Sequence, residues 1–154
     1  MFNERTWKDG EKLAAEYMRK HGYKIMYTNY FCVKVELDIV AILPRKTQLK
    51  RLKLEYRVNI KNTKVLSNKK TLKINYNNLK KNIHDLLIVC EVKARSSAEF
   101  GKGYDAVDSF KQKNMIRGAN YLLSTKEFEN MQVRFDVASI DNDKITYIEN
   151  AFTC

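Results

Sequence analysis

Residues 86–94 read LLIVCEVKA, an apolar run that only Glu91 and Lys93 interrupt. These two residues are two positions apart, so in a strand they project from the same face. A nearly continuous apolar run is typical of a strand that helices cover on both faces of a sheet. The stretch therefore predicts a central strand of an α/β protein and places an acid and a lysine together on it.

A second strand is predicted at residues 33–43, which read VKVELDIVAIL. Strand alternation places Glu36 and Asp38 on one face. The opposite face is then apolar, with Val35, Leu37 and Ile39.

A helix is predicted from near Thr6 to His21, because Gly22 is a typical residue just after a helix C-terminus. At 100° per residue, Glu11 lies within about 20° of Met18 on the apolar stripe of this helix. A carboxylate is unusual at such a position, which makes Glu11 a candidate site residue.

The remaining elements are a short strand at residues 23–27, a helix from Ser109 to about Leu123 and a C-terminal hairpin. The hairpin strands are Gln132–Ile140 and Lys144–Ile148, joined by turn-forming residues. The inward residues of the second helix are predicted to be Phe110, Met115, Ala119 and Leu122. The order of elements predicts a mixed α/β fold in one domain, residues 1–154.

Positive charge is concentrated in residues 44–84. The chain has 29 Lys and Arg against 18 Asp and Glu, a formal net charge of +11. Residues 44–84 hold 13 of the basic residues and one acid, Glu55, so they carry +12 and the remainder −1. Charge localised in this way favours contact with a polyanion such as nucleic acid. The candidate contact residues are Lys50, Arg51, Lys53, Arg57, Lys69 and Lys70.

The basic segment, residues 44–84, is predicted to be a β-hairpin-like insertion. Apolar and polar residues alternate from Leu52 to Lys61, the period of a half-buried strand, and Leu72–Tyr76 repeats the pattern. The alternative is a partly disordered insertion, since the segment is biased toward Lys, Asn, Ile and Tyr.

Composition argues against a membrane or disulfide-bonded protein. The longest apolar runs, residues 39–43 and 86–90, are much shorter than the roughly 20 residues that span a bilayer. The polar N-terminus lacks the apolar core of a signal peptide. The three cysteines, Cys32, Cys90 and Cys154, show no CxxC spacing, which favours reduced thiols in the cytoplasm.

Four charged residues break apolar patterns: Glu11, Asp38, Glu91 and Lys93. Mg²⁺ prefers a few carboxylate oxygens, completed by water and phosphate. A lysine beside such a metal can orient a water molecule or neutralise charge on a phosphate. The set therefore predicts a metal or phosphate site. The structural alternative is a buried ion-pair network in which Lys93 neutralises Asp38 and Glu91.

Eight short motifs follow one another along the chain: GEKLAA (10–15), GYKI (22–25), ELDIVA (36–41), EVKAR (91–95), FG (100–101), KQ (111–112), RFDV (134–137) and NAF (150–152). In order and number they resemble the YraN family of bacterial proteins, related to the PD-(D/E)xK nucleases and archaeal Holliday-junction resolvases. The resemblance covers nearly the whole chain except residues 44–84. Val35 departs from it, since the family usually has Gly there.

The resemblance implies a restriction-endonuclease-like α-β-β-β-α-β core with a mixed sheet flanked by helices. Asp38, Glu91 and the Val92 carbonyl would hold Mg²⁺ or Mn²⁺, and Glu11 would complete the metal site. Lys93 would position the attacking water. Glu36, Lys111 and Gln112 are expected to support the site.

The function expected from this resemblance is metal-dependent hydrolysis of phosphodiester bonds in DNA, branched or single-stranded, in repair or recombination. Resolvase relatives act as dimers, so a homodimer is also expected. The alternative is a non-catalytic nucleic-acid-binding or adaptor protein that keeps the nuclease-like fold.

Overall fold

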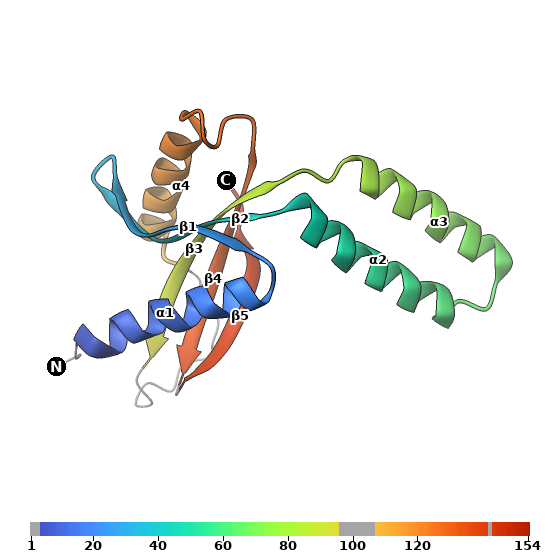
Figure 1. Ribbon diagram of the computed structural model, residues 1–154, viewed down its shortest axis with the longest axis horizontal. Helices are drawn as coiled ribbons and strands as arrows, with labels where there is room; N and C mark the ends of the chain where they lie inside the picture. Colours follow the sequence, from blue (N-terminus) through green and yellow to red (C-terminus); the bar gives the residue numbers. More distant parts are fainter. Residues whose placement is uncertain (1–3, 96–106, 142) are drawn as a thin grey trace.

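The computed structural model describes residues 4–95, 107–141 and 143–154, with the backbone alone for residues 4–8 and 95. It shows one five-stranded sheet in the order β1-β2-β3-β4-β5, with helices packed against it (Figure 1). The elements are α1 (Glu4–Lys20), β1 (Lys24–Cys32), β2 (Val35–Leu43), α2 (Arg45–Asn62), α3 (Leu66–Lys81), β3 (Leu86–Arg95), α4 (Ser109–Leu123), β4 (Gln132–Asp141) and β5 (Lys144–Phe152).

The apolar run at residues 86–94 forms β3, the central strand of the sheet. β3 pairs antiparallel with β2 and parallel with β4, while β1 and β5 form the antiparallel edges. Parallel neighbours need a crossover connection, and α4 lies in the connection between β3 and β4. The predicted α/β fold and its C-terminal hairpin are confirmed.

Helices cover both faces of the sheet, as the apolar character of β3 predicts. On one face Ala14 and Met18 of α1 pack in a buried cluster with Ile88 of β3. On the other face Met115 of α4 packs in a second cluster with Val89 of β3. Figure 1 shows α1 and α4 separated by the strands.

The inward face of α4 was predicted correctly at Met115, Ala119 and Leu122, all of which are buried. The prediction was wrong at Phe110, which is 73% exposed. At 100° per residue Phe110 lies about 140° from Met115, off the buried stripe. Gly118 is buried instead, and a Cβ atom added there would lie 2.8 Å from Cδ2 of Leu37.

We expect Gly118→Ala to destabilise the fold by about 1 kcal/mol. Alanine improves helix propensity by roughly 0.5–1 kcal/mol, but overpacking a core typically costs about 1–3 kcal/mol. The added methyl group would also lie 3.0 Å from Cγ of the buried Leu37, an atom near the backbone that cannot move aside freely. Urea denaturation measures the change. If the variant were more stable than the natural chain, α4 could move away from Leu37 of β2 at little cost in free energy.

The predicted alternation of β2 was wrong at Ile39. Val35 and Leu37 pack in the α4-side cluster, but Ile39 packs in the α1-side cluster with Ala41. Backbone pairing between β2 and β3 begins only at Ile39, so the preceding residues of β2 pair with β1 alone. The shift in alternation between Leu37 and Ile39 falls at Asp38.

The predicted β-hairpin-like form of residues 44–84 was wrong, because this segment forms two helices, α2 and α3, which we call the arm. The arm projects from the end of the sheet at which β2 ends and β3 begins (Figure 1). Neither arm helix contains a buried residue. Tyr56 and Tyr76 stack between the helices, with ring centroids 4.6 Å apart.

The arm is helical because its apolar residues fit helical as well as strand spacing. Leu52, Tyr56 and Ile60 are four residues apart, and all three are partly buried in the arm. Leu54 and Val58, which completed the strand pattern, are more than half exposed. Lys, Arg and Leu also favour helices, whereas Lys is depleted in strands. In the described part of the chain, no helix is long and apolar enough to cross a membrane.

Candidate metal and phosphate site

Asp38 lies where β2 and β3 separate. The last paired residues before it are Ile39 and Cys90. Beyond this pair, the Asp38 side chain takes the place of a backbone carbonyl of β2. Its Oδ2 accepts a hydrogen bond from the Val92 N–H at 2.8 Å. Asp38 is buried, so this bond fixes its carboxylate beside β3.

Glu91 of β3 and Lys111 of α4 complete the centre of the site. The Asp38 and Glu91 carboxyl groups interact, since the charge of Asp38, after burial, contributes to raising the pKa of Glu91. Nζ of Lys111 lies 2.8 Å from Oε2 of Glu91 and 3.7 Å from Oδ1 of Asp38. The structure therefore brings three of the predicted residues together, and Lys111 contacts the acids directly rather than from a second layer.

The charged form of Glu91 is costly at this site. Burial, followed by the charge of Asp38, raises the pKa of Glu91 to about 7. Burial alone would lower the pKa of Lys111, but its hydrogen bond to Glu91 and the charge of Asp38 raise it. Lys111 offsets part of this cost, and a cation bound beside the two acids would favour the charged form of Glu91 further.

Glu11 of α1 is buried, as its position on the apolar stripe of the helix predicted. A buried carboxylate needs a polar partner. Its Oε2 accepts a hydrogen bond from Nδ2 of Asn29 at 2.7 Å. Asn29 interrupts the β1–β2 ladder between the pairs Thr28–Ile39 and Tyr30–Leu37, and its φ is 51°. Asn tolerates this left-handed conformation better than most residues.

Asn29 was missed in the sequence, because the predicted strand ended at residue 27 whereas β1 continues to Cys32. Its pairing position lies opposite Asp38 in the β1–β2 register. The only signal was an Asn close to several aromatic residues in the sequence, because strands are depleted in Asn.

The other predicted residues lie around this centre. Lys93 follows Glu91 on β3 and is partly buried. Glu36 is exposed, and its charge contributes to the raised pKa of Lys111 after the contributions of Glu91 and Asp38. Gln112 donates from Nε2 to the Val107 carbonyl at 2.6 Å, so it holds the start of α4 rather than the acids.

A divalent cation is compatible with the pair of acids. Among the described residues, no three His, Cys, Asp or Glu side chains are grouped as a complete metal site. Mg²⁺ is often held by one or two carboxylates, with water and substrate phosphate as further ligands. Asp38 and Glu91 supply such a pair, and a bound cation would favour their charged forms.

In metal-free protein, we expect Glu91→Gln to increase stability more at about pH 8 than at about pH 5. The folded pKa of about 7 exceeds the usual unfolded value of about 4.3, so folding favours the protonated acid. The stability that Glu91 contributes is therefore fully present below about pH 4.3 and is lost as the pH rises through about 7.

The expected difference for Glu91→Gln is roughly 1–2 kcal/mol, measured by urea denaturation in EDTA. Glu129→Gln, at an exposed position, is the control for loss of one negative charge. If the stability of both variants depended on pH in the same way, the pKa of Glu91 would not be raised in the folded protein.

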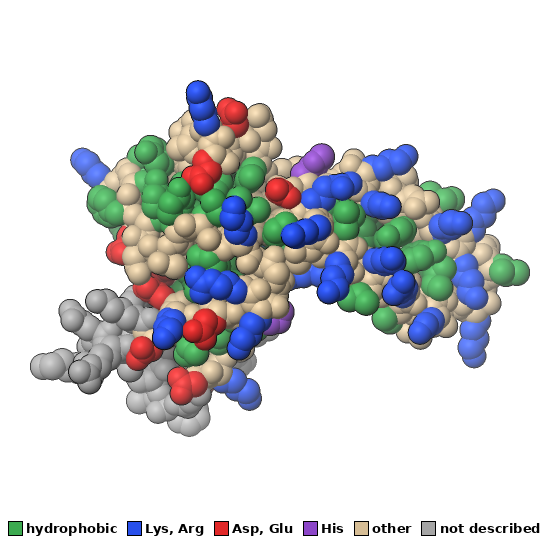
Figure 2. Space-filling model, viewed as in Figure 1, with side chains coloured by type: hydrophobic (Ala, Val, Ile, Leu, Met, Phe, Trp, Pro, Cys, Tyr) green, Lys and Arg blue, Asp and Glu red, His purple; other side chains and the backbone are tan. Residues whose placement is uncertain are grey.

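The predicted nucleic-acid contacts all lie on the arm. Four of the six are exposed, whereas Arg51 and Lys69 are partly buried. Arg51 binds Oε1 of Glu149 at 2.8 Å and the His21 carbonyl at 3.0 Å, so it joins the arm to the core. In the view of Figure 2, Lys and Arg side chains crowd the arm, while most Asp and Glu side chains lie over the core.

Comparison with known proteins relates this chain to one family over most of its length. The family model described as "Uncharacterised protein family UPF0102" matches residues 10–140. A UPF0102 protein of Thermodesulfovibrio yellowstonii is 30% identical over 145 residues, which cover 94% of this chain and 93% of the relative. One from Alkaliphilus oremlandii is 30% identical over 156 residues, covering 97% and 99%. One from Caldanaerobacter subterraneus is 27% identical, covering 93% and 90%.

Proposed function

This chain belongs to the uncharacterised protein family UPF0102, and we propose that it is a metal-dependent nuclease that hydrolyses phosphodiester bonds in DNA. The observation that carries the proposal is the buried Asp38–Glu91 pair, held at the opening between β2 and β3 with Lys111 against it. Two buried acids in contact are costly unless they have a function or a cation to share.

The arrangement of the core supports a restriction-endonuclease-like assignment. α1 is followed by three strands, a helix and a fourth strand in one mixed sheet, apart from the inserted arm. The acids stand on two neighbouring strands, and Lys93 follows Glu91 on the same face of β3. Fold alone does not establish activity, so the proposal depends on these side chains.

In the proposed reaction, each side chain has a separate task. Asp38, oriented by the Val92 N–H, and Glu91 would hold Mg²⁺ or Mn²⁺. When bound, the metal would polarise the phosphate and lower the pKa of a water molecule. Lys93 would orient the attacking water. When Glu91 holds the metal and no longer binds Lys111, Lys111 would neutralise charge on the phosphate.

The supporting residues keep these groups in place. Glu11 and Asn29 form a partly buried hydrogen bond that links α1 to the interrupted part of β1, opposite Asp38. Gln112 and Asp108 secure the first turn of α4, since Asp108 Oδ1 accepts from the Lys111 N–H at 2.8 Å. This capping bond holds the backbone from which the Lys111 side chain reaches the acids.

A second function, non-catalytic binding of nucleic acid, is favoured by the arm. Its concentration of 13 basic residues against one acid suits a polyanion whether or not the strand is cut. This function requires neither Asp38 nor Glu91, so binding that persists without any cleavage would support it.

The direct test is cleavage of labelled single-stranded, duplex and four-way-junction DNA in Mg²⁺, Mn²⁺ or EDTA. Asp38→Asn, purified identically, exposes contaminating nuclease. Cleavage by the natural chain alone, and only with metal, would support the proposal and identify the preferred substrate. If the folded natural chain and the variant behave alike on all three substrates in both metals, the proposed activity is wrong for them.

A further inference from the structure

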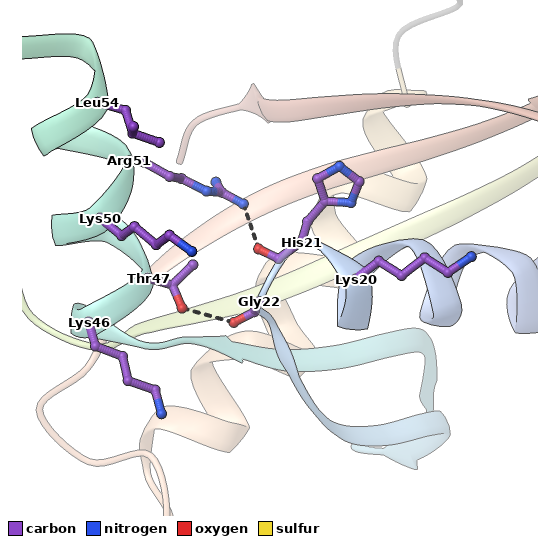
Figure 3. Close-up of a pocket in the computed structure, with 8 residues that line it drawn as sticks. All are labelled: Lys20, His21, Gly22, Lys46, Thr47, Lys50, Arg51 and Leu54. Atoms are coloured by element: carbon purple, nitrogen blue, oxygen red, sulfur yellow. Dashed lines mark hydrogen bonds between the residues drawn. The ribbon is translucent and has the colours of Figure 1, made fainter. Parts of the chain in front are cut away.

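A hollow of about 500 Å³ lies at the base of the arm, between the end of α1 and the first turns of α2 (Figure 3). Among the residues that the structure describes, its lining includes four basic side chains and no acidic one. The lining residues are Lys20, His21, Gly22, Lys46, Thr47, Lys50, Arg51 and Leu54. The Asp38–Glu91 site is elsewhere, on the α4 side of the sheet and about five residues along β2 from the arm.

The walls of the hollow are fixed before any ligand binds. Gly22 has a φ of 85°, and a Cβ atom there would lie 2.8 Å from Cγ2 of Thr47. The close approach allows the Thr47 hydroxyl to donate to the Gly22 carbonyl at 3.1 Å, while Arg51 donates to the His21 carbonyl (Figure 3). A preformed site loses little conformational entropy on binding.

The same hydrogen bonds remove groups that would repel an anion. The carbonyls at the end of α1 carry partial negative charge. Those of Tyr17, His21 and Gly22 accept bonds from side-chain donors. Arg51 also forms an ion pair with Glu149 and so neutralises the charge of this carboxylate. What faces the hollow is therefore predominantly positive.

Lys46 and Lys50 supply charge that nothing in the described chain neutralises. Both are exposed, and neither makes an ion pair with a described carboxylate. They are four residues apart on α2, where like charges repel and destabilise a helix. An anion bound between them would relieve that repulsion.

A basic stripe continues from the hollow along the whole of α2. At 100° per residue its five members fall within an arc of about 80°, and Glu55 lies on the far side of the helix. With a rise of about 1.5 Å per residue, the stripe is about 22 Å long. Its members are Lys46, Lys50, Lys53, Arg57 and Lys61.

We propose that the hollow binds a backbone phosphate of a nucleic acid strand that lies along this basic stripe. A row of regularly spaced cations, one turn apart, suits a polymer with a regular charge on every unit. The inference shares the nucleic acid partner of the proposed nuclease, but it does not depend on chemistry at Asp38 and Glu91.

The test measures anisotropy of a labelled 20-nucleotide strand and of its duplex in EDTA, so that no strand is cut. Lys46→Ala/Lys50→Ala removes two of the four basic side chains that line the hollow. Lys80→Ala/Lys81→Ala removes two exposed charges from α3 of the same arm and is the matched control. All four substituted residues are exposed, and thermal unfolding by circular dichroism checks that each variant is folded.

We expect the hollow variant to weaken binding about tenfold or more and the control about twofold to threefold. Each lost phosphate contact should also reduce the slope of log affinity against log salt by about one. Equal losses in the two variants would overturn the inference, because general charge would then explain binding. Absence of binding by the natural chain at low salt would overturn it as well.

Two competitors identify the occupant. If the hollow variant binds pyrophosphate more weakly but binds the DNA strand as tightly as the natural chain does, the hollow is a site for a small free phosphate. That result would overturn the inference. Polyglutamate that competes as well as DNA of equal charge would assign it to an acidic protein. Cleavage assays on the same variants separate the two proposals, since the hollow can bind without cutting and Asp38 can cut without the hollow.

Discussion

Asp38→Asn is expected to lower DNA cleavage in Mg²⁺ by at least about 10³-fold, equivalent to about 4 kcal/mol of transition-state stabilisation. Asn keeps the shape of the side chain and an oxygen that can accept from the Val92 N–H, which Asp38 binds at 2.8 Å. It removes the negative charge that would hold the metal. The variant therefore separates metal binding from local structure.

Two measurements make this prediction specific. The variant should bind DNA in EDTA as tightly as the natural chain, because the arm carries the basic residues. Asp141→Asn, an exposed carboxyl at the end of β4, should cut normally. Cleavage by Asp38→Asn within about twofold of the natural chain would remove Asp38 from the mechanism.

Asp136→Asn is expected to lower the free energy of unfolding by about 3–5 kcal/mol, the usual cost of breaking a buried charge pair. Asp136 is completely buried on β4. Its two oxygens accept four hydrogen bonds: two from Arg134 and one each from the Tyr147 hydroxyl and the Asn150 N–H. An amide cannot accept all four and leaves the Arg134 charge poorly compensated.

Urea denaturation near pH 7 measures this cost, and a fall in Tm of about 10 °C is expected for a chain of this length. Glu149→Gln is the comparison, because Glu149 also binds Arg134 but its side chain is 44% exposed. The latter change should cost about 1 kcal/mol or less. Equal costs would mean that the Asp136 cluster does not stabilise β4 and β5 as its burial indicates.

The Asp136 cluster has a consequence for the arm. Arg134 also donates to the Tyr23 hydroxyl, which in turn donates to Glu149. Glu149 binds Arg51 of α2, whose guanidinium lies 5.2 Å from the centre of the Tyr23 ring. A chain of contacts thus joins the buried core to the wall of the hollow.

The sequence alone determined the class of the fold and the identity of the paired acids. The nearly continuous apolar run at residues 86–94 is typical of a strand that helices cover on both faces, which predicted an α/β fold. Asp38 and Glu91 could be identified as site residues because a charged residue within an apolar stretch is costly to bury unless it has a partner or a ligand. Both statements depend on local pattern, which the chain carries without its tertiary contacts.

The arm shows where local pattern was insufficient. Leu52, Tyr56 and Ile60 satisfy both periods, so the alternation at residues 52–60 did not distinguish a strand from a helix. None of the five described strands pairs with this segment, and helical hydrogen bonds satisfy its backbone locally. Helix propensity of the Lys- and Leu-rich sequence then decided the outcome.

Tertiary structure also decided which groups meet. It placed Lys111 of α4 directly on the two acids and gave Glu11 the partner Asn29. It assembled the Asp136 cluster, and it formed the hollow from α1 and α2, which the strands β1 and β2 separate in the sequence. Sequence spacing carries no information on such contacts, because they depend on how distant elements pack and on where β2 and β3 separate.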